Sequence, residues 1–336
     1  MIIPASFLPG GLFADVLPPP LHGGRYLTLQ FEAVPLVLIL GALALYVWGV
    51  VRNNRLHPRH RWSVGKTAAF VSGLFVTAVA VFSFIGIYDD VLFWDHMVQH
   101  LMLIMVAAVL FAVASPLDLA FRATTGEAHR WVARGLRSQV ALVFGHPVVI
   151  FVLYAVVIPV THLTVFYNYT LEHEPVHNAE HLIFLAIGYL FWRQIFGSDP
   201  NRYRMNQGVK MLYLFLAVPI DTFVGLSLDN ETHEIFTYYL TMHRGWGPSL
   251  LTDLHIGGVI MWVGGDTLMM AALIPVAIQW MHQEERRGVR SDRELDALMA
   301  DPDPVLPDPV VGVSDPVLPG PGSVLSDPGP VPKSPR

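Results

Sequence analysis

Cysteine is absent from this chain of 336 residues, which excludes disulfide bonds and thiolate metal ligands. Charge is scarce as well, since charged residues make up only 14% of the chain against 53% hydrophobic residues. These proportions exclude an ordinary soluble domain of this length. The net charge of −6 comes with no basic patch, which argues against a nucleic-acid partner.

Long hydrophobic runs are what the chain has instead. Seven of them approach the roughly 20 residues that a helix needs to cross a bilayer. Continuous apolarity predicts helices rather than strands, because a backbone exposed to lipid must satisfy its own hydrogen bonds. We therefore predict an all-α, polytopic membrane protein with seven transmembrane helices, at residues 34–51, 64–87, 92–115, 147–163, 176–196, 209–228 and 254–280.

Basic residues predict the orientation of these helices, because Lys and Arg in short loops remain on the cytoplasmic side. Of the 21 lysines and arginines, all except Arg25 and Arg244 fall in alternate loops and in the C-terminal segment. The opposite loops carry acids: Asp89, Asp90, Glu172, Glu174, Asp229, Glu231 and Glu234. The N-terminus is thus expected outside and the C-terminus inside.

The flanking segments differ in composition from the seven-helix domain at 34–282. Residues 1–33 are expected to form an outer segment, without the pattern of a removable signal peptide. Residues 283–300 form a polar cytoplasmic segment, and 301–336, which holds 11 of the 26 prolines, is expected to be disordered. Residues 122–140 are interpreted either as an amphipathic helix on the inner surface or as a plain connector.

Two histidine pairs, His96/His100 and His177/His181, have a spacing of four residues. Residues four apart share a helix face, with Cβ atoms about 5 to 6 Å apart, so each pair can direct two imidazoles at one ion. The predicted topology places both pairs at the outer leaflet. Capping or hydrogen bonding accounts for a single histidine, but a titratable pair inside a membrane is costly without a partner, so we favour metal ligation.

Neighbouring residues extend this hypothesis. Further candidate ligands are His162, His173 and His255, together with Met97, whose thioether with imidazole would suit copper. Methionine is more often core filler. Candidate partners that orient the imidazoles are Asp95, Gln99 and Glu180. The intramembrane acids Asp221 and Asp266 have no assigned role, and no catalytic residue is predicted.

Three segments resemble the seven-helix, CtaG-type assembly factors found with caa3-type cytochrome c oxidases. They are Phe93-Trp94-Asp95-His96-Met97-Val98-Gln99-His100-Leu101, His177-Asn178-Ala179-Glu180-His181-Leu182-Ile183-Phe184-Leu185 and Gly257-Gly258-Val259-Ile260-Met261-Trp262-Val263. The resemblance covers roughly residues 34–282. It implies a non-enzymatic protein of the bacterial plasma membrane that helps oxidase subunits mature, supplying copper at the outer face.

Other interpretations compete with this one. A haem-bearing redox protein would use one histidine from the third predicted helix and one from the fifth as axial ligands. A metal or ion transporter would bind a coupling ion at Asp221 and Asp266. His177-Asn178-Ala179-Glu180-His181 also matches the inverted zinc-protease pattern, but no cleft signature accompanies it.

Overall fold

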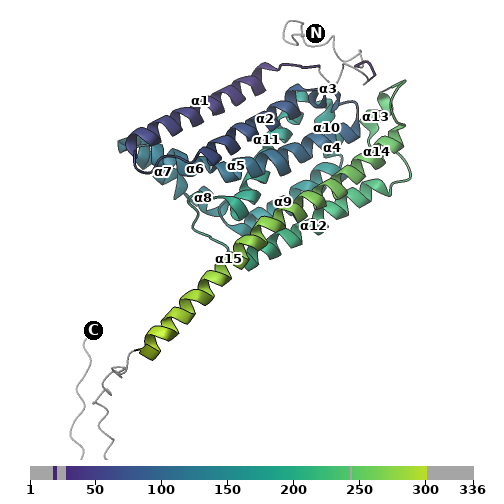
Figure 1. Ribbon diagram of the computed structural model, residues 1–336. Coiled ribbons are helices and arrows are strands. Elements are labelled where there is room, and N and C mark those ends of the chain that lie inside the picture. The colour runs from purple at the N-terminus through teal and green to yellow at the C-terminus, as the bar shows by residue number, and fades with distance from the viewer. Residues whose placement is uncertain (1–17, 21–27, 243, 301–336) are drawn as a thin grey trace, which may run out of the picture. The chain divides into compact units, whose positions relative to one another are not determined.

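The computed structural model describes residues 18–20, 28–242 and 244–300, and these residues form an all-helical architecture, which confirms the all-α part of the prediction. Figure 1 shows the order of elements. The helices of the first half are α1 Ala33–Leu56, α2 Val64–Phe82, α3 Ile85–Tyr88, α4 Phe93–Leu101, η2 Met102–Ala107, α5 Ala108–Ala114, α6 Pro116–Ala123, α7 Gly126–Leu136 and α8 Gln139–Val143. Those of the second half are α9 Pro147–Leu163, α10 Phe166–Glu172, α11 Glu174–Phe196, α12 Gln207–Asp229, α13 Thr237–Thr241, α14 Leu250–Val259, η3 Ile260–Gly264 and α15 Gly265–Ala300.

Helices cover nearly all of the seven predicted stretches, although the second, 64–87, is interrupted at residues 83–84 between α2 and α3. By length and composition, five helices qualify as membrane spans, or six if α9 and α10, which are bent by 69°, count as one. The fifth predicted span, α11, falls outside that group although it packs in the bundle against α5, η2 and α9. The molecule is therefore a multi-pass membrane protein, whereas seven spans and the orientation remain predictions.

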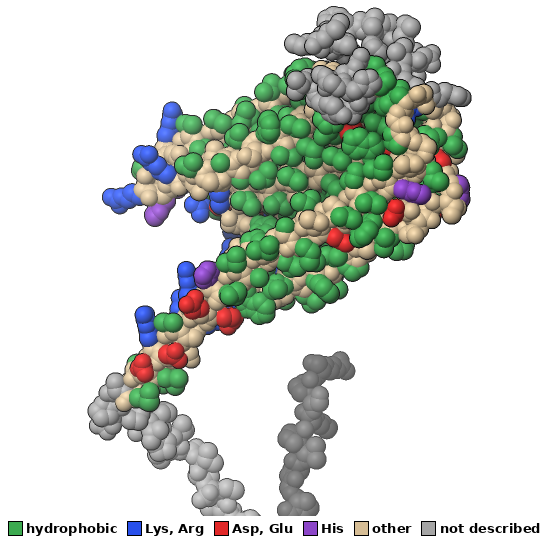
Figure 2. Space-filling view, turned by 45° about the vertical axis from the view of Figure 1, so that its right-hand side comes forward, with side chains coloured by type: hydrophobic (Ala, Val, Ile, Leu, Met, Phe, Trp, Pro, Cys, Tyr) green, Lys and Arg blue, Asp and Glu red, His purple; other side chains and the backbone are tan. Residues whose placement is uncertain are grey.

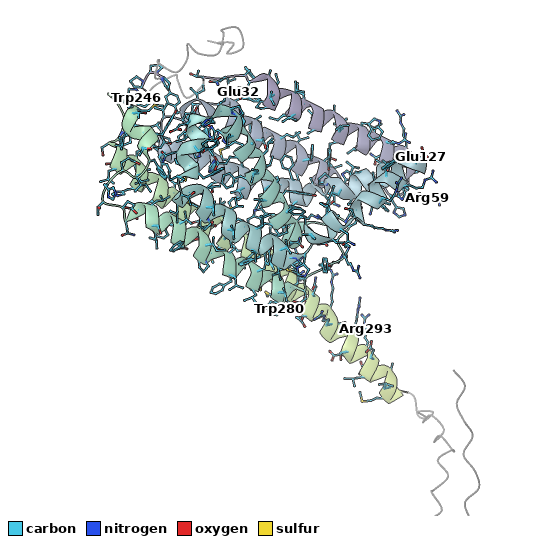
Figure 3. All side chains as sticks on the ribbon, turned by 180° about the vertical axis from the view of Figure 1, so that it is seen from behind. Glu32, Arg59, Glu127, Trp246, Trp280 and Arg293 are labelled. Carbon is cyan, nitrogen blue, oxygen red and sulfur yellow. The ribbon has the colours of Figure 1, made fainter. Side chains whose placement is uncertain are left out.

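The bundle of residues 28–283 has two chemically different ends. Figure 3 shows Glu32 and Trp246 at one end and Arg59 and Glu127 at the other. We call the first the histidine end, because α4 and α11 begin there with their histidine pairs and α9 ends there. We call the second the arginine end, because Lys and Arg gather there while apolar side chains cover the face between, as Figure 2 shows.

The segment 122–140 is not one helix. It contains the end of α6, then α7, and then the start of α8, with breaks at Thr124 and at Arg137. Ser138 begins α8 by accepting a hydrogen bond from the Ala141 N–H at 3.1 Å, which is ordinary N-cap chemistry. Neither α7 nor α8 contains a buried residue, so this segment lies on the surface at the arginine end.

Two helices carry short π-helical segments, and both follow the elements that begin at the histidine end. The segment η2 continues α4 and η3 continues α14. A π-helical turn leaves the regular hydrogen-bond ladder, and the Trp192 indole N–H donates to the Ile104 carbonyl in η2 at 2.9 Å. The register of each helix therefore changes below the histidines.

Glycine lets α12 and α14 approach closely. A Cβ at Gly225 would lie 2.6 Å from Trp262 Cβ and 2.7 Å from the Gly258 carbonyl oxygen, and neither neighbour is a flexible chain end. We expect Gly225→Ala to lower the free energy of unfolding by about 1–3 kcal/mol, the usual cost of overpacking. Thermal unfolding of the purified protein in detergent measures this effect.

The matched control is Gly41→Ala in α1, because a Cβ there meets nothing within 4 Å. Alanine favours the helix over glycine by up to about 1 kcal/mol, so this variant should unfold no earlier than the wild type. Equal unfolding temperatures for the two variants would contradict the close approach of α12 and α14.

Candidate metal centre

Five histidine rings from three helices meet at the histidine end. Helix α4 supplies His96 and His100, α11 supplies His177 and His181, and α9 supplies His162. The ring centroids are 4.0 Å apart for His96 and His100, 5.1 Å for His96 and His177, and 4.4 Å for His177 and His181. The two predicted pairs thus belong to one cluster.

The nitrogens of this cluster are buried and mostly without hydrogen bonds. His96 is 0% exposed, and neither of its ring nitrogens has a partner among the described residues. The same holds for the Nε2 atoms of His100, His177 and His181. A buried polar atom without a partner costs free energy, so these lone pairs are available to a ligand that replaces the missing hydrogen bonds.

A chain of hydrogen bonds assigns the tautomer of His100. The Nδ1 atom of His162 lies 2.9 Å from the Ile158 carbonyl oxygen, which only accepts, so His162 Nδ1 carries a proton. His162 Nε2 is then an acceptor for the His100 Nδ1–H group at 3.3 Å. His100 Nε2 therefore keeps its lone pair, as in metal-ligating histidines whose other nitrogen donates to a supporting group.

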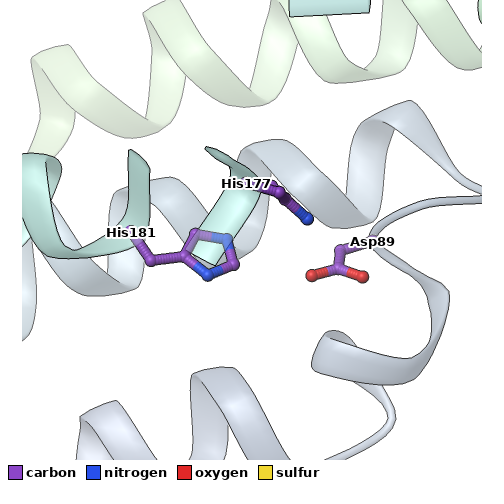
Figure 4. A group of neighbouring side chains, drawn as sticks. All are labelled: Asp89, His177 and His181. Atoms are coloured by element: carbon purple, nitrogen blue, oxygen red, sulfur yellow. The ribbon is translucent and has the colours of Figure 1, made fainter. Parts of the chain in front are cut away.

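Carboxylates border the cluster. Asp89, His177 and His181 form one group whose potential ligand atoms lie within 4.8 Å of one another, and Figure 4 shows these three side chains. His96, His177 and Glu180 form a second such group. His177 belongs to both groups, so the two sets share one centre.

Residues 44–283 match the family described as cytochrome c oxidase caa3 assembly factor (Caa3_CtaG). The chain belongs to this family. The matched region contains every histidine of the cluster and all of its bordering carboxylates.

Curated relatives of this chain are found in mycobacteria. An uncharacterized protein of Mycobacterium leprae is 28% identical over 301 residues, covering 85% of this chain and 45% of the relative. An uncharacterized protein of Mycobacterium bovis is 28% identical over 298 residues, covering 85% of this chain and 44% of the relative. The chain thus spans less than half the length of these relatives. No solved structure matches it.

Asp89 is a site residue that the sequence did not predict, since Asp89 and Asp90 were expected only among the acids of the outer loops. Asp89 Oδ2 accepts a hydrogen bond from the predicted orienting residue Gln99 at 2.7 Å, and Oδ1 accepts from the Asp90 N–H at 2.9 Å. Burial, followed by the charge of Asp90, raises the pKa of Asp89 above its usual range. The one sequence feature that could have indicated this role is that Asp89 and Asp90 shortly precede the pair His96/His100.

The other two predicted orienting residues, Asp95 and Glu180, are buried, and Glu180 belongs to one of the two groups described above. Asp95 is 0% exposed and Glu180 is 1% exposed, and neither carboxylate has a hydrogen-bond partner among the described side chains. A bound cation would replace the hydrogen bonds that these buried carboxylates lack.

Other candidate ligands make contacts elsewhere. Met97 is buried in the apolar core against Phe93 and Gly257. His173 is exposed, and its Nδ1 lies 3.0 Å from the Tyr169 carbonyl oxygen. His255 Nε2 lies 2.8 Å from the Glu231 carbonyl oxygen.

The two intramembrane acids lie deeper in the bundle, and each accepts hydrogen bonds from a hydroxyl. Tyr154 donates to both oxygens of Asp221, at 2.9 and 2.8 Å. Thr222 donates to Asp266 at 2.7 Å. A cavity of about 20 Å³, lined in part by His100, His162 and Asp221, lies between the histidines and Tyr154 and holds no more than one water molecule.

Proposed function

We propose that this protein is a non-enzymatic, copper-handling assembly factor for a cytochrome c oxidase in the bacterial plasma membrane. The observation that carries the proposal is the cluster of buried imidazoles whose nitrogens lack hydrogen bonds. The family supports a role in oxidase assembly, and the cluster offers a place where the metal that such an oxidase needs can be held.

The ligand set favours copper as the cargo. It consists of imidazole nitrogens with carboxylate oxygens nearby and contains no cysteine. Imidazole suits zinc, copper, iron and nickel, and among divalent ions of this series copper binds a given site most tightly. The candidate ligands are His96, His100, His177 and His181, with Asp89 and Glu180 beside them.

An exposed carboxylate connects the buried cluster with solvent. The side chain of Asp90 is 51% exposed, whereas that of His177 is 8% exposed, and Asp90 Oδ1 lies 3.2 Å from His177 Nδ1. The predicted outer loops are acidic, and clefts of one charge sign concentrate ions of the other. A cation attracted to the acidic surface would thus meet Asp90 directly beside His177.

The packing of the histidines disfavours a haem protein. A haem with two axial histidines separates their rings by the macrocycle, whereas His96 and His177 stack directly at 5.1 Å. The transporter alternative is less favoured, since the Tyr154 hydroxyl donates to Asp221 and the Thr222 hydroxyl donates to Asp266, so each acid already has a hydrogen-bond partner.

Deleting the gene tests the assembly role. We expect the oxidase polypeptides to remain in the membrane but to be deficient in copper, because the subunits would fold without their metal supply. Elemental analysis of oxidase purified from the deletion strain measures the copper content. Complementation with the wild-type chain should restore it, and complementation with His181→Ala should not.

The matched control for complementation is His173→Ala, since His173 is exposed and bonds to a backbone carbonyl. Normal copper content in the oxidase of the deletion strain would rule out the proposed function. Equal rescue by His181→Ala and the wild type would rule out the histidine cluster as the part responsible.

A further inference from the structure

A second cavity lies at the arginine end, at the opposite end of α11 from His177 and His181. Its volume is about 460 Å³, within the range of pockets that hold small ligands. Helices α6, α7, α8 and α11 and the segment 200–203 line it. Most of the lining side chains are apolar, among them Leu117, Leu136, Val140, Phe144 and Leu190.

One buried cation, Arg193, lines this apolar cavity. Arg193 is 9% exposed, its Nη2 donates to the Pro200 carbonyl at 3.0 Å, and its Nε has no hydrogen-bond partner in the described part of the chain. Burying a charge without full hydrogen bonding is costly, so Arg193 would be stabilised by an anionic group.

The nearest acid does not satisfy Arg193. Asp199 Oδ2 lies 4.0 Å from Arg193 Nε, which is beyond hydrogen-bond distance. That oxygen accepts from the Tyr189 hydroxyl at 2.6 Å, and Asp199 Oδ1 accepts from the Asp118 N–H at 2.8 Å. Asp199 is therefore an ion-pair neighbour of Arg193 whose oxygens accept hydrogen bonds from other donors.

The helices beside the cavity have the side chains of a membrane interface. Trp131 and Val140 are each 65% exposed, and the Arg134 guanidinium lies 4.0 Å from the Trp131 ring centroid. Tryptophan and arginine on an amphipathic surface helix are typical of the headgroup level, where apolar side chains enter the acyl region. Arg202, which is exposed, adds a second cation to the lining.

We propose that this cavity binds an anionic phospholipid, with an acyl chain against the apolar lining and the phosphate at Arg193 and Arg202. Charge complementarity selects this occupant, because a basic pocket between membrane helices on the cytoplasmic side is suited to an anionic headgroup. The cavity leaves room for the chain, and the arginines favour an anionic over a zwitterionic lipid. The proposal does not depend on metal binding at the histidine end.

Native mass spectrometry of the delipidated full-length chain tests the proposal, with phosphatidylglycerol and phosphatidylcholine as probes. We expect one phosphatidylglycerol to bind saturably and at least about fivefold more tightly than phosphatidylcholine. Arg202→Gln should weaken the binding of phosphatidylglycerol about fivefold. Ala120→Phe, which fills the cavity, should abolish binding.

Arg59→Gln is the matched control, since Arg59 is an exposed arginine at the same end that does not line the cavity. Its lipid affinity should equal that of the wild type. Equal binding of the two lipids, or equal loss in Arg59→Gln and Arg202→Gln, would overturn the proposal. Tight binding of glycerol phosphate, which has no acyl chains, would show that the cavity is an anion site rather than a lipid site. If Ala120→Phe does not fold, the lipid affinity of Arg202→Gln tests the proposal.

Discussion

His100→Ala is expected to abolish stoichiometric copper binding by the purified protein. His100 Nε2 is a buried lone pair in the middle of the cluster, between His96 and His181. Its loss removes one of the unpartnered ring nitrogens, on the ring next to His162 and His181, and leaves His96, His177 and His181 as the remaining imidazoles of the two pairs. Elemental analysis after copper loading, together with titration against a competing chelator, measures the effect.

His162→Ala should have a smaller effect of a different kind. Both ring nitrogens of His162 are engaged, one with Ile158 and one with His100, so His162 orients His100 rather than offering a lone pair. Removing such a supporting group costs about 10–100-fold in metal affinity while the stoichiometry is retained. His173→Ala should change neither quantity.

These variants separate ligation from folding. Full copper stoichiometry and affinity in His100→Ala would refute the ligand assignment. Equal losses in His162→Ala and His100→Ala, together with lower thermal stability of both, would instead indicate that the histidines act through packing.

Arg244→Met should lower the free energy of unfolding by about 3–5 kcal/mol, because it leaves a buried carboxylate without its partner. Arg244 Nη1 lies 3.0 Å from Asp253 Oδ2, and both side chains are 2% exposed. Arg244 also donates to the carbonyls of Val91 and Pro248, at 2.7 and 2.8 Å. It thereby fastens the segment before α14 to the start of α4, next to the histidines.

Two comparisons check this result by thermal unfolding in detergent. Adding Asp253→Asn to Arg244→Met should restore part of the stability, since the charge is removed while an oxygen still accepts from the Trp94 N–H. Arg287→Met removes an exposed pair with Glu284 and should cost no more than about 1 kcal/mol. Equal destabilisation by Arg244→Met and Arg287→Met would contradict the role of the buried pair.

Much of the fold was predictable because hydrophobic length is a local property. Helices cover nearly all of the seven predicted stretches, with a break at residues 83–84 in the second, and the bounds differ by a few residues at most of their ends. The interruption of residues 122–140 was not predicted, since Ser138 acts as a cap only if the chain turns before it. Arg244, an exception to the distribution of basic residues, is explained by its buried pair with Asp253. The predicted disordered tail, 301–336, and Arg25 lie outside the described residues.

The candidate metal centre was also predictable in part, because some of its features are local in the sequence. The spacing within each histidine pair is local, and the predicted topology brought the pairs to one level. His173 has the same spacing to His177, but it is the N-cap of α11 with φ −133° and ψ 91°, so it leaves the shared helix face. Met97 follows His96 directly and therefore points to another face of α4. The position of Asp89 depends on how the turn before α4 folds, which no local pattern shows.

The π-helical segment η2 means that α4, η2 and α5 cannot be drawn on one helical wheel. A π-helical turn holds more residues than the 3.6 of an α-helix, so positions after Ala107 are rotated relative to positions before Met102. Above the segment, one face presents His96 and His100 to the cluster. Below it, α5 packs against α2 and α11. The face that α5 packs against its neighbours is therefore offset by a fixed rotation from the face that carries the imidazoles, so the two faces do not follow one 3.6-residue pattern.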